Sequence, residues 1–153
     1  MPETLCGFND IPGGASRQEQ LTAWGPTLMV DIGIDLNYRP GPPWTVPVPG
    51  VTGIQALVDT GAGESCIDNL LAGQLNLPVV DRRPISGVHG AHIVNMYLAQ
   101  IHVPSLAFTI YGAFAGVDLA AGGQLHKALI GRTFLQSFTM VYEGLTGTVK
   151  LSR

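Results

Sequence analysis

Glycine and proline interrupt this chain so often that long helices have little room to form. Twenty glycines and eleven prolines are spread over 153 residues, and both residue types end regular structure or mark turns. The short apolar segments between them are typical of strands. A chain of this length is expected to form one domain, which buries roughly 70% of the surface that the unfolded chain exposes. The pattern therefore predicts a single domain built from short strands.

Two segments have the pattern of buried or half-buried strands. Residues 28–36 alternate between polar and apolar positions, and residues 51–58 form a largely apolar run. Residues 68–75 are the best helix candidate, because they combine a capping residue with leucines four positions apart. The other predicted elements are a hairpin over 84–103, a strand over 106–114, a small-residue loop over 115–123, a buried run at 128–130, a short helix at 132–136 and a final hairpin over 139–151.

Two segments lack the pattern of either a strand or a helix. Residues 1–26 show no sustained period and are predicted to form an extended or loosely packed N-terminal arm, ahead of a domain over residues 27–153. Residues 39–50 carry five prolines and cannot form a central strand, since proline has no N–H to donate to the ladder. We expect an ordered or semi-rigid loop there, with Trp44 anchoring it on the domain.

Charge and composition exclude several classes of protein. The net charge is −3 and no lysine- or arginine-rich run is present, so no nucleic-acid partner is expected. Apolar stretches end well before 18 residues, which predicts no membrane span. The N-terminus does not have the pattern of a signal peptide. Cys6 and Cys66 are too few for a disulfide framework or a metal knuckle, and a cytoplasmic location is expected.

One motif carries the chemistry that the sequence suggests. Residues 56–62 read Ala-Leu-Val-Asp-Thr-Gly-Ala, which puts the Asp59 carboxylate at the exit of a buried strand. Thr60 and Gly61 then turn the chain, and glycine permits close approach of another backbone. A lone Asp-Thr-Gly is a weak signal, because chance produces one in a few per cent of chains of this size. About seventy residues later, Leu-Ile-Gly-Arg at residues 129–132 places an apolar pair before glycine and a short helix.

Together, these features resemble the retroviral-type (retropepsin-like) aspartic peptidases over roughly residues 27–151. The resemblance implies an all-β, closed-barrel domain of the acid protease type with one short helix. It also implies a homodimeric hydrolase that cleaves peptide bonds in extended polypeptides and needs no metal or organic cofactor. Its expected partners are a polypeptide substrate and a second copy of itself.

The resemblance also implies roles for individual residues. Asp59 would be the catalytic residue, Thr60 would bond across to the partner chain beneath the two aspartates, and Gly61 would offer its carbonyl to the substrate backbone. Ala62 completes the motif, and its lack of a hydroxyl implies a pH optimum less acid than that of single-chain relatives. The tip of a flap that closes over substrate would be formed by Gly87, Val88, His89 and Gly90. The supporting element after the second apolar pair would be formed by Ile130, Gly131 and Arg132, with Glu64 as the expected partner of the arginine.

The chemistry requires two carboxylates, and the chain supplies one. Two aspartates held about 3 Å apart share a single proton, which allows one to act as base and the other as acid. Only one Asp-Thr-Gly is present and no internal repeat is evident. A two-fold homodimer supplies the second Asp59. By resemblance, the chain ends would interleave in a sheet at the interface, through residues 148–151 and part of the arm over residues 1–26.

Plainer interpretations accompany each of these assignments. Asp59 could be an ordinary turn residue at a strand end. His89, His92 and His102 could suggest a metal site, but a spacing of three on a strand puts the first two rings on opposite faces. Cys66 is expected to be a core residue and not a nucleophile. Two alternative functions stay open: a catalytically weak peptide-binding or dimerisation module, and a domain that processes its own N-terminal arm.

Overall fold

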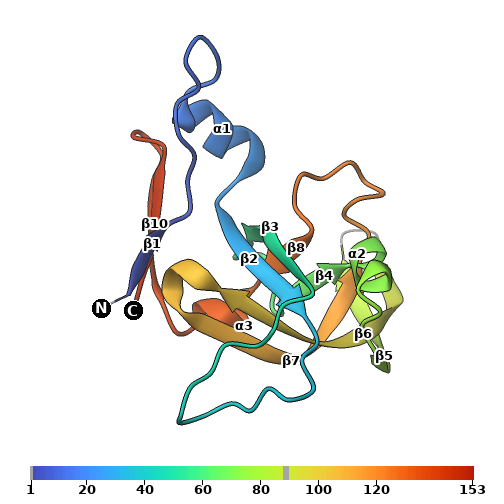
Figure 1. The fold of residues 1–153 in the computed structure, drawn as a ribbon. Helices are drawn as coiled ribbons and strands as arrows, with labels where there is room; N and C mark the ends of the chain where they lie inside the picture. Colours follow the sequence, from blue (N-terminus) through green and yellow to red (C-terminus); the bar gives the residue numbers. More distant parts are fainter. Residues whose placement is uncertain (1, 88–89) are drawn as a thin grey trace.

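Strands make up most of the regular structure of this chain, as the glycine and proline content predicted. The computed structural model describes residues 2–87 and 90–153, and it is 44% strand and 14% helix (Figure 1). The helices are α1 (Arg17–Trp24), α2 (Asn69–Gln74) and α3 (Arg132–Leu135), with a 3-10 turn η1 (Pro104–Leu106). The strands are β1 (Glu3–Leu5), β2 (Thr27–Gly33), β3 (Val51–Val58), β4 (Cys66–Asp68), β5 (Val79–Gly87), β6 (Gly90–Val103), β7 (Phe108–Val117), β8 (Ala128–Ile130), β9 (Thr139–Glu143) and β10 (Thr148–Ser152).

The larger sheet has seven strands in the order β2-β3-β8-β4-β7-β6-β5. An additional antiparallel pairing joins β2 to β6, with Ile32 opposite Ile101. The pairings therefore run in a circuit from β2 through to β6 and back, and β5 extends from β6 outside that circuit. The main core includes the fully buried Val30, Ile67 and Ile130, which come from three of these strands. The strand predicted over 28–36 is confirmed only as far as Gly33, where β2 ends, and Leu36, which was expected on the buried face, is 74% exposed.

The helix predicted over 68–75 is confirmed by α2, and its cap also secures a distant loop. Asp68 is buried and accepts a hydrogen bond from Leu71 N at 3.2 Å, in the manner of an N-cap. Its other carboxylate oxygen accepts from Leu119 N and Ala120 N, each at 2.9 Å. Three backbone donors thus compensate the burial of one charge, and the loop after β7 is fixed beside α2.

The N-terminal region is more ordered than the extended or loosely packed arm that the sequence suggested. β1 pairs antiparallel with β10, with Thr4 opposite Leu151. Ser16 caps α1 by accepting from Glu19 N at 3.1 Å, and Leu21 is buried in the main core. This helix has only a weak sequence signal, because one of its eight residues is buried and no apolar stripe forms.

The proline-rich residues 39–50 form a loop without strand or helix, as predicted. Asp35 joins the two ends of this loop, because its carboxylate accepts hydrogen bonds from Asn37 N and from Val48 N, both at 2.9 Å. These backbone donors lower the pKa of Asp35 below its usual value. Trp44, however, is 73% exposed. The expectation that it anchors the loop by burial is therefore wrong.

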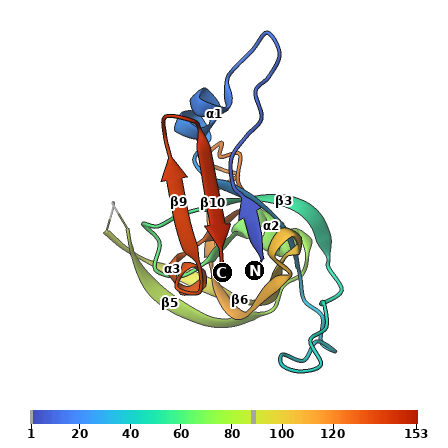
Figure 2. The same cartoon turned by 90° about the vertical axis from the view of Figure 1, so that its left-hand side faces the viewer.

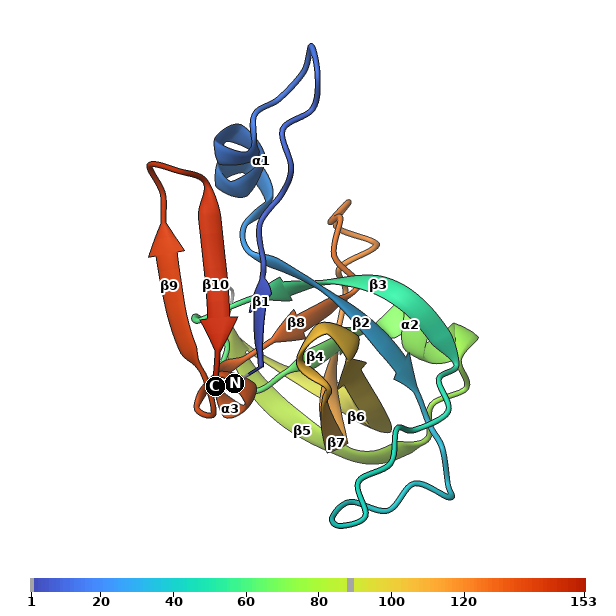
Figure 3. The ribbon, with the colours of Figure 1, turned by 60° about the vertical axis from the view of Figure 1, so that its left-hand side comes forward.

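A second, three-stranded sheet has the order β1-β10-β9, with β10 between the other two strands (Figure 2). The final hairpin is confirmed, and Val141 lies opposite Lys150 in it. Helix α1 lies beside the turn of this hairpin (Figure 3), where Gln18 Nε2 donates to Gly144 O at 2.9 Å. The sheet thus ties the N-terminal region to the C-terminal hairpin.

Candidate active site

Asp59 directly follows β3, and the neighbouring strand β8 fixes its backbone position. The two strands are parallel, with Val58 opposite Ile130, and Asp59 N donates to Ile130 O at 2.9 Å. The carboxylate turns back on its own loop, because its Oδ1 accepts from Gly61 N at 2.9 Å. The side chain is half-buried. This geometry is that of an Asx turn at a strand end, and it holds the carboxylate in one orientation.

Gly131 lets the Asp59 loop pack directly against the start of α3. A Cβ at Gly131 would lie 2.6 Å from both the carbonyl carbon and the carbonyl oxygen of Glu64, and 3.0 Å from Ala62 O. Any side chain there would collide with backbone that cannot swing away. Glycine at this position is therefore required by the contact between two segments that are about seventy residues apart in the sequence.

Arg132 binds the same loop through both its backbone and its side chain. Its N–H donates to Ala62 O at 2.9 Å, and its Nη1 donates to Thr60 O at 2.7 Å. Within residues 2–87 and 90–153, no ion pair joins Arg132 to Glu64. The expected carboxylate partner is thus replaced by a backbone carbonyl, which can also accept a charge-assisted hydrogen bond.

Ser65 is a supporting residue that the sequence interpretation missed. It is buried, and its Oγ accepts from Gly131 N at 3.0 Å. One more backbone bond, from Thr133 N to Gly63 O at 3.0 Å, completes the junction. The only sequence signal is a small hydroxyl residue just before a buried strand. Ser65 becomes meaningful only when the partner segment is known.

The outer part of the loop faces away from the core. Thr60 and Gly61 are exposed and Ala62 is half-buried. Among the residues that the structure describes, no hydrogen bond is made by the Thr60 hydroxyl. An exposed loop with a fixed carboxylate and a free hydroxyl can bind a ligand or another chain.

An apolar cluster adjoins Asp59 on the side of the hairpin. Cys66, Met96 and Ala115 are buried together, and partly buried side chains surround them from the hairpin, from β7 and from β8: Ile85, Val94, Val117 and Leu129. Burial raises the pKa of the Cys66 thiol to about 11, and the negative charges of Glu64 and Asp59 add to this rise. Cys66 is therefore a protonated core thiol and not a nucleophile.

A cavity of about 650 Å³ opens beside this cluster. It runs along β6 from His92 to Asn95 and reaches Asp118 in the loop after β7. Ile85, Val94 and Val117 belong both to its wall and to the apolar cluster. The hairpin thus presents a concave surface of mixed polarity, of the size typical of ligand sites. Asp59 is not among its lining residues, and the cavity adjoins the apolar cluster instead.

The predicted flap hairpin is formed by β5 and β6, and Gly87 lies opposite Gly90. Val88 and His89, which the sequence placed at its tip, lie outside the described residues. His92 is exposed on β6, whereas His102 is buried and its Nδ1 lies 2.8 Å from Thr109 Oγ1. Among the described residues, no group of three His, Cys, Asp or Glu side chains is placed to hold a metal ion.

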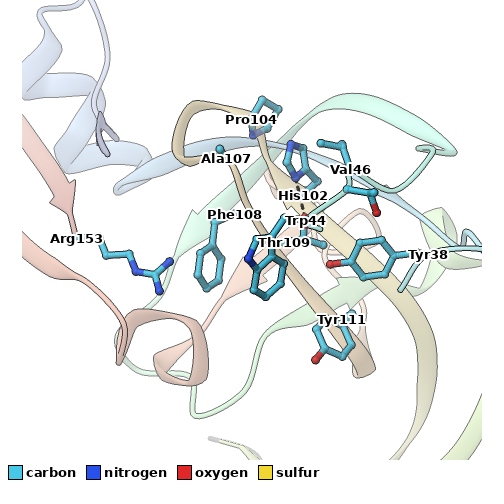
Figure 4. Close-up of a pocket in the computed structure, with 11 residues that line it drawn as sticks. Tyr38, Trp44, Val46, His102, Pro104, Ala107, Phe108, Thr109, Tyr111 and Arg153 are labelled. Atoms are coloured by element: carbon cyan, nitrogen blue, oxygen red, sulfur yellow. Dashed lines mark hydrogen bonds between the residues drawn. The ribbon is translucent and has the colours of Figure 1, made fainter. Parts of the chain in front are cut away.

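A second cavity, of about 820 Å³, is formed under the proline-rich loop. Tyr38, Trp44 and Tyr111 line it together with the His102–Thr109 pair, and Arg153 lies at one end (Figure 4). The Arg153 guanidinium stacks on Phe108 at 5.1 Å from the ring centre. Asp59 is not among its lining residues, so this cavity is separate from the candidate active site.

The chain path is similar to that of two solved structures. EIAV protease in complex with the inhibitor HBY-793 aligns with 20% identity and a TM-score of 0.48, covering 73% of this chain and 86% of that one. The retroviral protease-like domain of Ddi1 from Leishmania major aligns with 18% identity and a TM-score of 0.41, covering 76% and 81%. No protein-family model matches the chain, and no curated protein sequence matches it. No helix in the described parts of the chain is both long and apolar enough to cross a membrane.

Proposed function

We propose that this protein is an aspartic endopeptidase whose active site forms when two copies bring their Asp59 side chains together. The observation that carries the proposal is the junction at the exit of β3. There residues 131–133 donate four hydrogen bonds to the segment that follows Asp59. Gly131 N donates to Ser65 Oγ, Arg132 donates to Ala62 O and Thr60 O, and Thr133 N donates to Gly63 O. A simple turn residue needs no such support, whereas catalytic carboxylates must be held rigidly.

The proposed chemistry uses one proton shared by two carboxylates. At a separation of about 3 Å the two Asp59 groups cannot both ionise, so they titrate as a coupled pair. The ionised group takes a proton from a water molecule between them, and the protonated group donates to the scissile carbonyl. The water attacks to give a tetrahedral intermediate, without an acyl-enzyme. This chemistry needs no metal or organic cofactor, and it predicts a bell-shaped pH profile with an acidic to mildly acidic optimum.

The proposed substrate is an extended polypeptide that binds between the hairpin and the Asp59 loop. Two features support it: the apolar cluster that includes Val94 and Leu129, and the cavity along residues 92–95. A strand-like peptide in this position offers alternate side chains to the cluster. Apolar residues beside the scissile bond are therefore expected to be preferred.

Two alternative functions differ from the proposed peptidase in how they would use this structure. A non-hydrolysing peptide-binding module would use the same apolar surface without a functional Asp59 pair. Self-processing of the N-terminal arm is disfavoured, because β1 and Leu21 pack against the rest of the domain. Cleavage between them would cut the fold and not a free tail.

The test is cleavage of a diverse peptide mixture between pH 3 and pH 8, roughly the range over which a carboxylate pair titrates, by wild type and by Asp59→Asn. We expect cleavage by wild type alone, with a rate that rises more steeply than linearly with enzyme concentration. Asp10→Asn is a matched control, since Asp10 is exposed, lies in the N-terminal region and lines neither of the cavities described above. Equal cleavage by Asp59→Asn would remove Asp59 from the mechanism. No cleavage by a folded, dimeric wild type would favour the binding module.

A further inference from the structure

The small sheet restricts how a second copy can attach to this chain. The family resemblance suggested pairing through residues 148–151, which belong to β10. In the structure β10 is flanked by β1 on one side and β9 on the other. Both backbone edges of β10 are therefore occupied within its own chain. Among the described residues, the edges left without a partner strand in this sheet are the outer edges of β1 and β9.

We infer that two copies pair antiparallel through the outer edge of β9, with Val141 opposite Val141 of the second copy. This inference rests on the proposed function, because it names the surface that would bring two Asp59 loops together. The result is a continuous six-stranded sheet across the two chains, in which the two β9 strands are central. The same edge meets itself, as a closed two-fold dimer requires.

The composition of β9 favours self-pairing. Val141 is 41% exposed and Tyr142 is 53% exposed, and exposed apolar side chains on a free strand edge mark a site of strand addition. When Val141 lies opposite its own copy, Thr139 lies opposite Glu143, so the two Glu143 carboxylates stay at opposite ends of the pair. No like charges face each other across the junction.

The other free edge is less suitable. β1 has three residues, and Glu3 at its start lies 3.9 Å from Lys150 in an ion pair within the chain. A self-paired β1 would have Thr4 opposite Thr4 and only a short ladder. A five-residue strand offers more backbone donors and acceptors than a three-residue strand.

The position of β9 in the chain also connects it to Asp59. The strand begins four residues after α3 ends at Leu135, and the start of α3 carries Gly131 and Arg132, which bind the Asp59 loop. Docking two β9 strands therefore positions two α3 helices and, through them, two Asp59 loops. Pairing through β1 would give no such connection through α3, because β1 pairs with β10 and not with the residues that bind the Asp59 loop.

The test is a disulfide across the two-fold axis. Residues directly opposite in an antiparallel pair have Cα atoms about 4.5–5.5 Å apart, which is within the range of about 4.4–6.8 Å for a disulfide. Under mild oxidation at low protein concentration, Val141→Cys is expected to form a covalent dimer that reducing agent reverses. Thr4→Cys, the equivalent variant at the centre of β1, is expected to stay monomeric on a non-reducing gel. Wild type controls for Cys6 and Cys66, which are both buried.

A second variant measures the interface without crosslinking. Val141→Arg would place two guanidinium groups opposite each other, and like charges that face each other at an interface disfavour association. The dimer dissociation constant in sedimentation experiments is expected to rise by about a hundredfold or more. Thr4→Arg is expected to leave it unchanged. Circular dichroism shows whether each variant is folded.

The outcomes separate this inference from the proposed function. Crosslinking of Thr4→Cys in place of Val141→Cys, equal crosslinking of both, or crosslinking of neither would overturn the assignment of β9. Peptide cleavage that depends on Asp59 would still support the peptidase in each of those cases. Efficient crosslinking of Val141→Cys without any peptide cleavage would support the interface and count against the peptidase.

Discussion

Gly131 N donates to Ser65 Oγ at 3.0 Å, and this buried hydrogen bond joins the two segments of the candidate active site. Ser65 follows the Asp-Thr-Gly loop and Gly131 precedes α3, so the bond spans 66 residues of sequence. The other bonds of the junction use the backbone or the exposed side chain of Arg132. Ser65 supplies the one buried side-chain acceptor among these bonds, and replacing it tests how far the loop depends on this support.

Ser65→Ala is expected to lower the free energy of unfolding by about 1–3 kcal/mol, because Gly131 N–H is left buried without an acceptor. Urea denaturation measures the change. Ser137→Ala, at an exposed position, is the matched control and should change stability little. An effect of Ser65→Ala no larger than that of the control would show that the junction does not need this bond.

Gly131→Ala is expected to destabilise the protein by about 1–3 kcal/mol, because the new methyl group meets Glu64 and Ala62 backbone atoms. Gly73→Ala is the control, since among the described residues no atom outside its own helix and chain neighbours lies within 4 Å of a Cβ there, and alanine favours α2 by about 0.5–1 kcal/mol. Thermal denaturation followed by circular dichroism should therefore shift in opposite directions for the two variants. A Gly131→Ala protein as stable as wild type would contradict the close approach.

His126 should make the fold less stable in mildly acid solution. Its side chain is buried, with Nε2 at 2.7 Å from Thr27 Oγ1, and burial lowers its pKa below the usual 6.5. As pH falls below 6.5, the unfolded chain takes up a proton that the folded chain resists, so stability declines towards the lowered pKa. The melting temperature should drop between pH 7.5 and pH 5, a range that spans the usual pKa of histidine.

His126→Gln is expected to remove part of that drop, because the amide can still donate to Thr27 but does not titrate. His92→Gln is the control, as His92 is exposed on β6. The same slope of melting temperature against pH in wild type and His126→Gln would contradict the assignment.

The two cysteines should resist modification in the folded protein. Burial raises the pKa of Cys6 to about 12, and burial with nearby negative charge raises that of Cys66 to about 11. Thiolate, the reactive form, is therefore scarce at pH 8. A thiol reagent that gives a coloured product should react slowly with native protein and rapidly in denaturant. Rapid reaction of one thiol per native chain would indicate an accessible, activated cysteine.

The features that could be predicted from the sequence are those set by neighbouring residues. β3 follows from an apolar run, α2 from a cap and a leucine pair, and α3 from glycine followed by a short helical stretch. The final hairpin follows from two apolar runs around Gly144 and Gly147. Each of these signals lies within about ten residues, where periodicity and turn chemistry act.

The features that escaped prediction depend on contacts between distant residues. β1 is short and gains its structure by pairing with β10, at the other end of the chain. The partner of Arg132 was expected to be Glu64. In the structure the Arg132 guanidinium donates a hydrogen bond to the Thr60 carbonyl instead. The role of Ser65 likewise becomes apparent only when Gly131 lies beside it. Local sequence patterns carry no information about such backbone approaches.

The pairing of β1 with β10 also determines how the fold responds to tension. Glu3 lies opposite Ser152, and Arg153 N donates to Pro2 O at 3.2 Å. The N-terminal end of β1 and the C-terminal end of β10 therefore lie side by side at the same end of the sheet. A pull on the chain before β1 and after β10 would load these bonds one after another, as in a zipper, and not all together in shear. The junction around Asp59 lies outside that path, so this sheet should open under force before the candidate active site does.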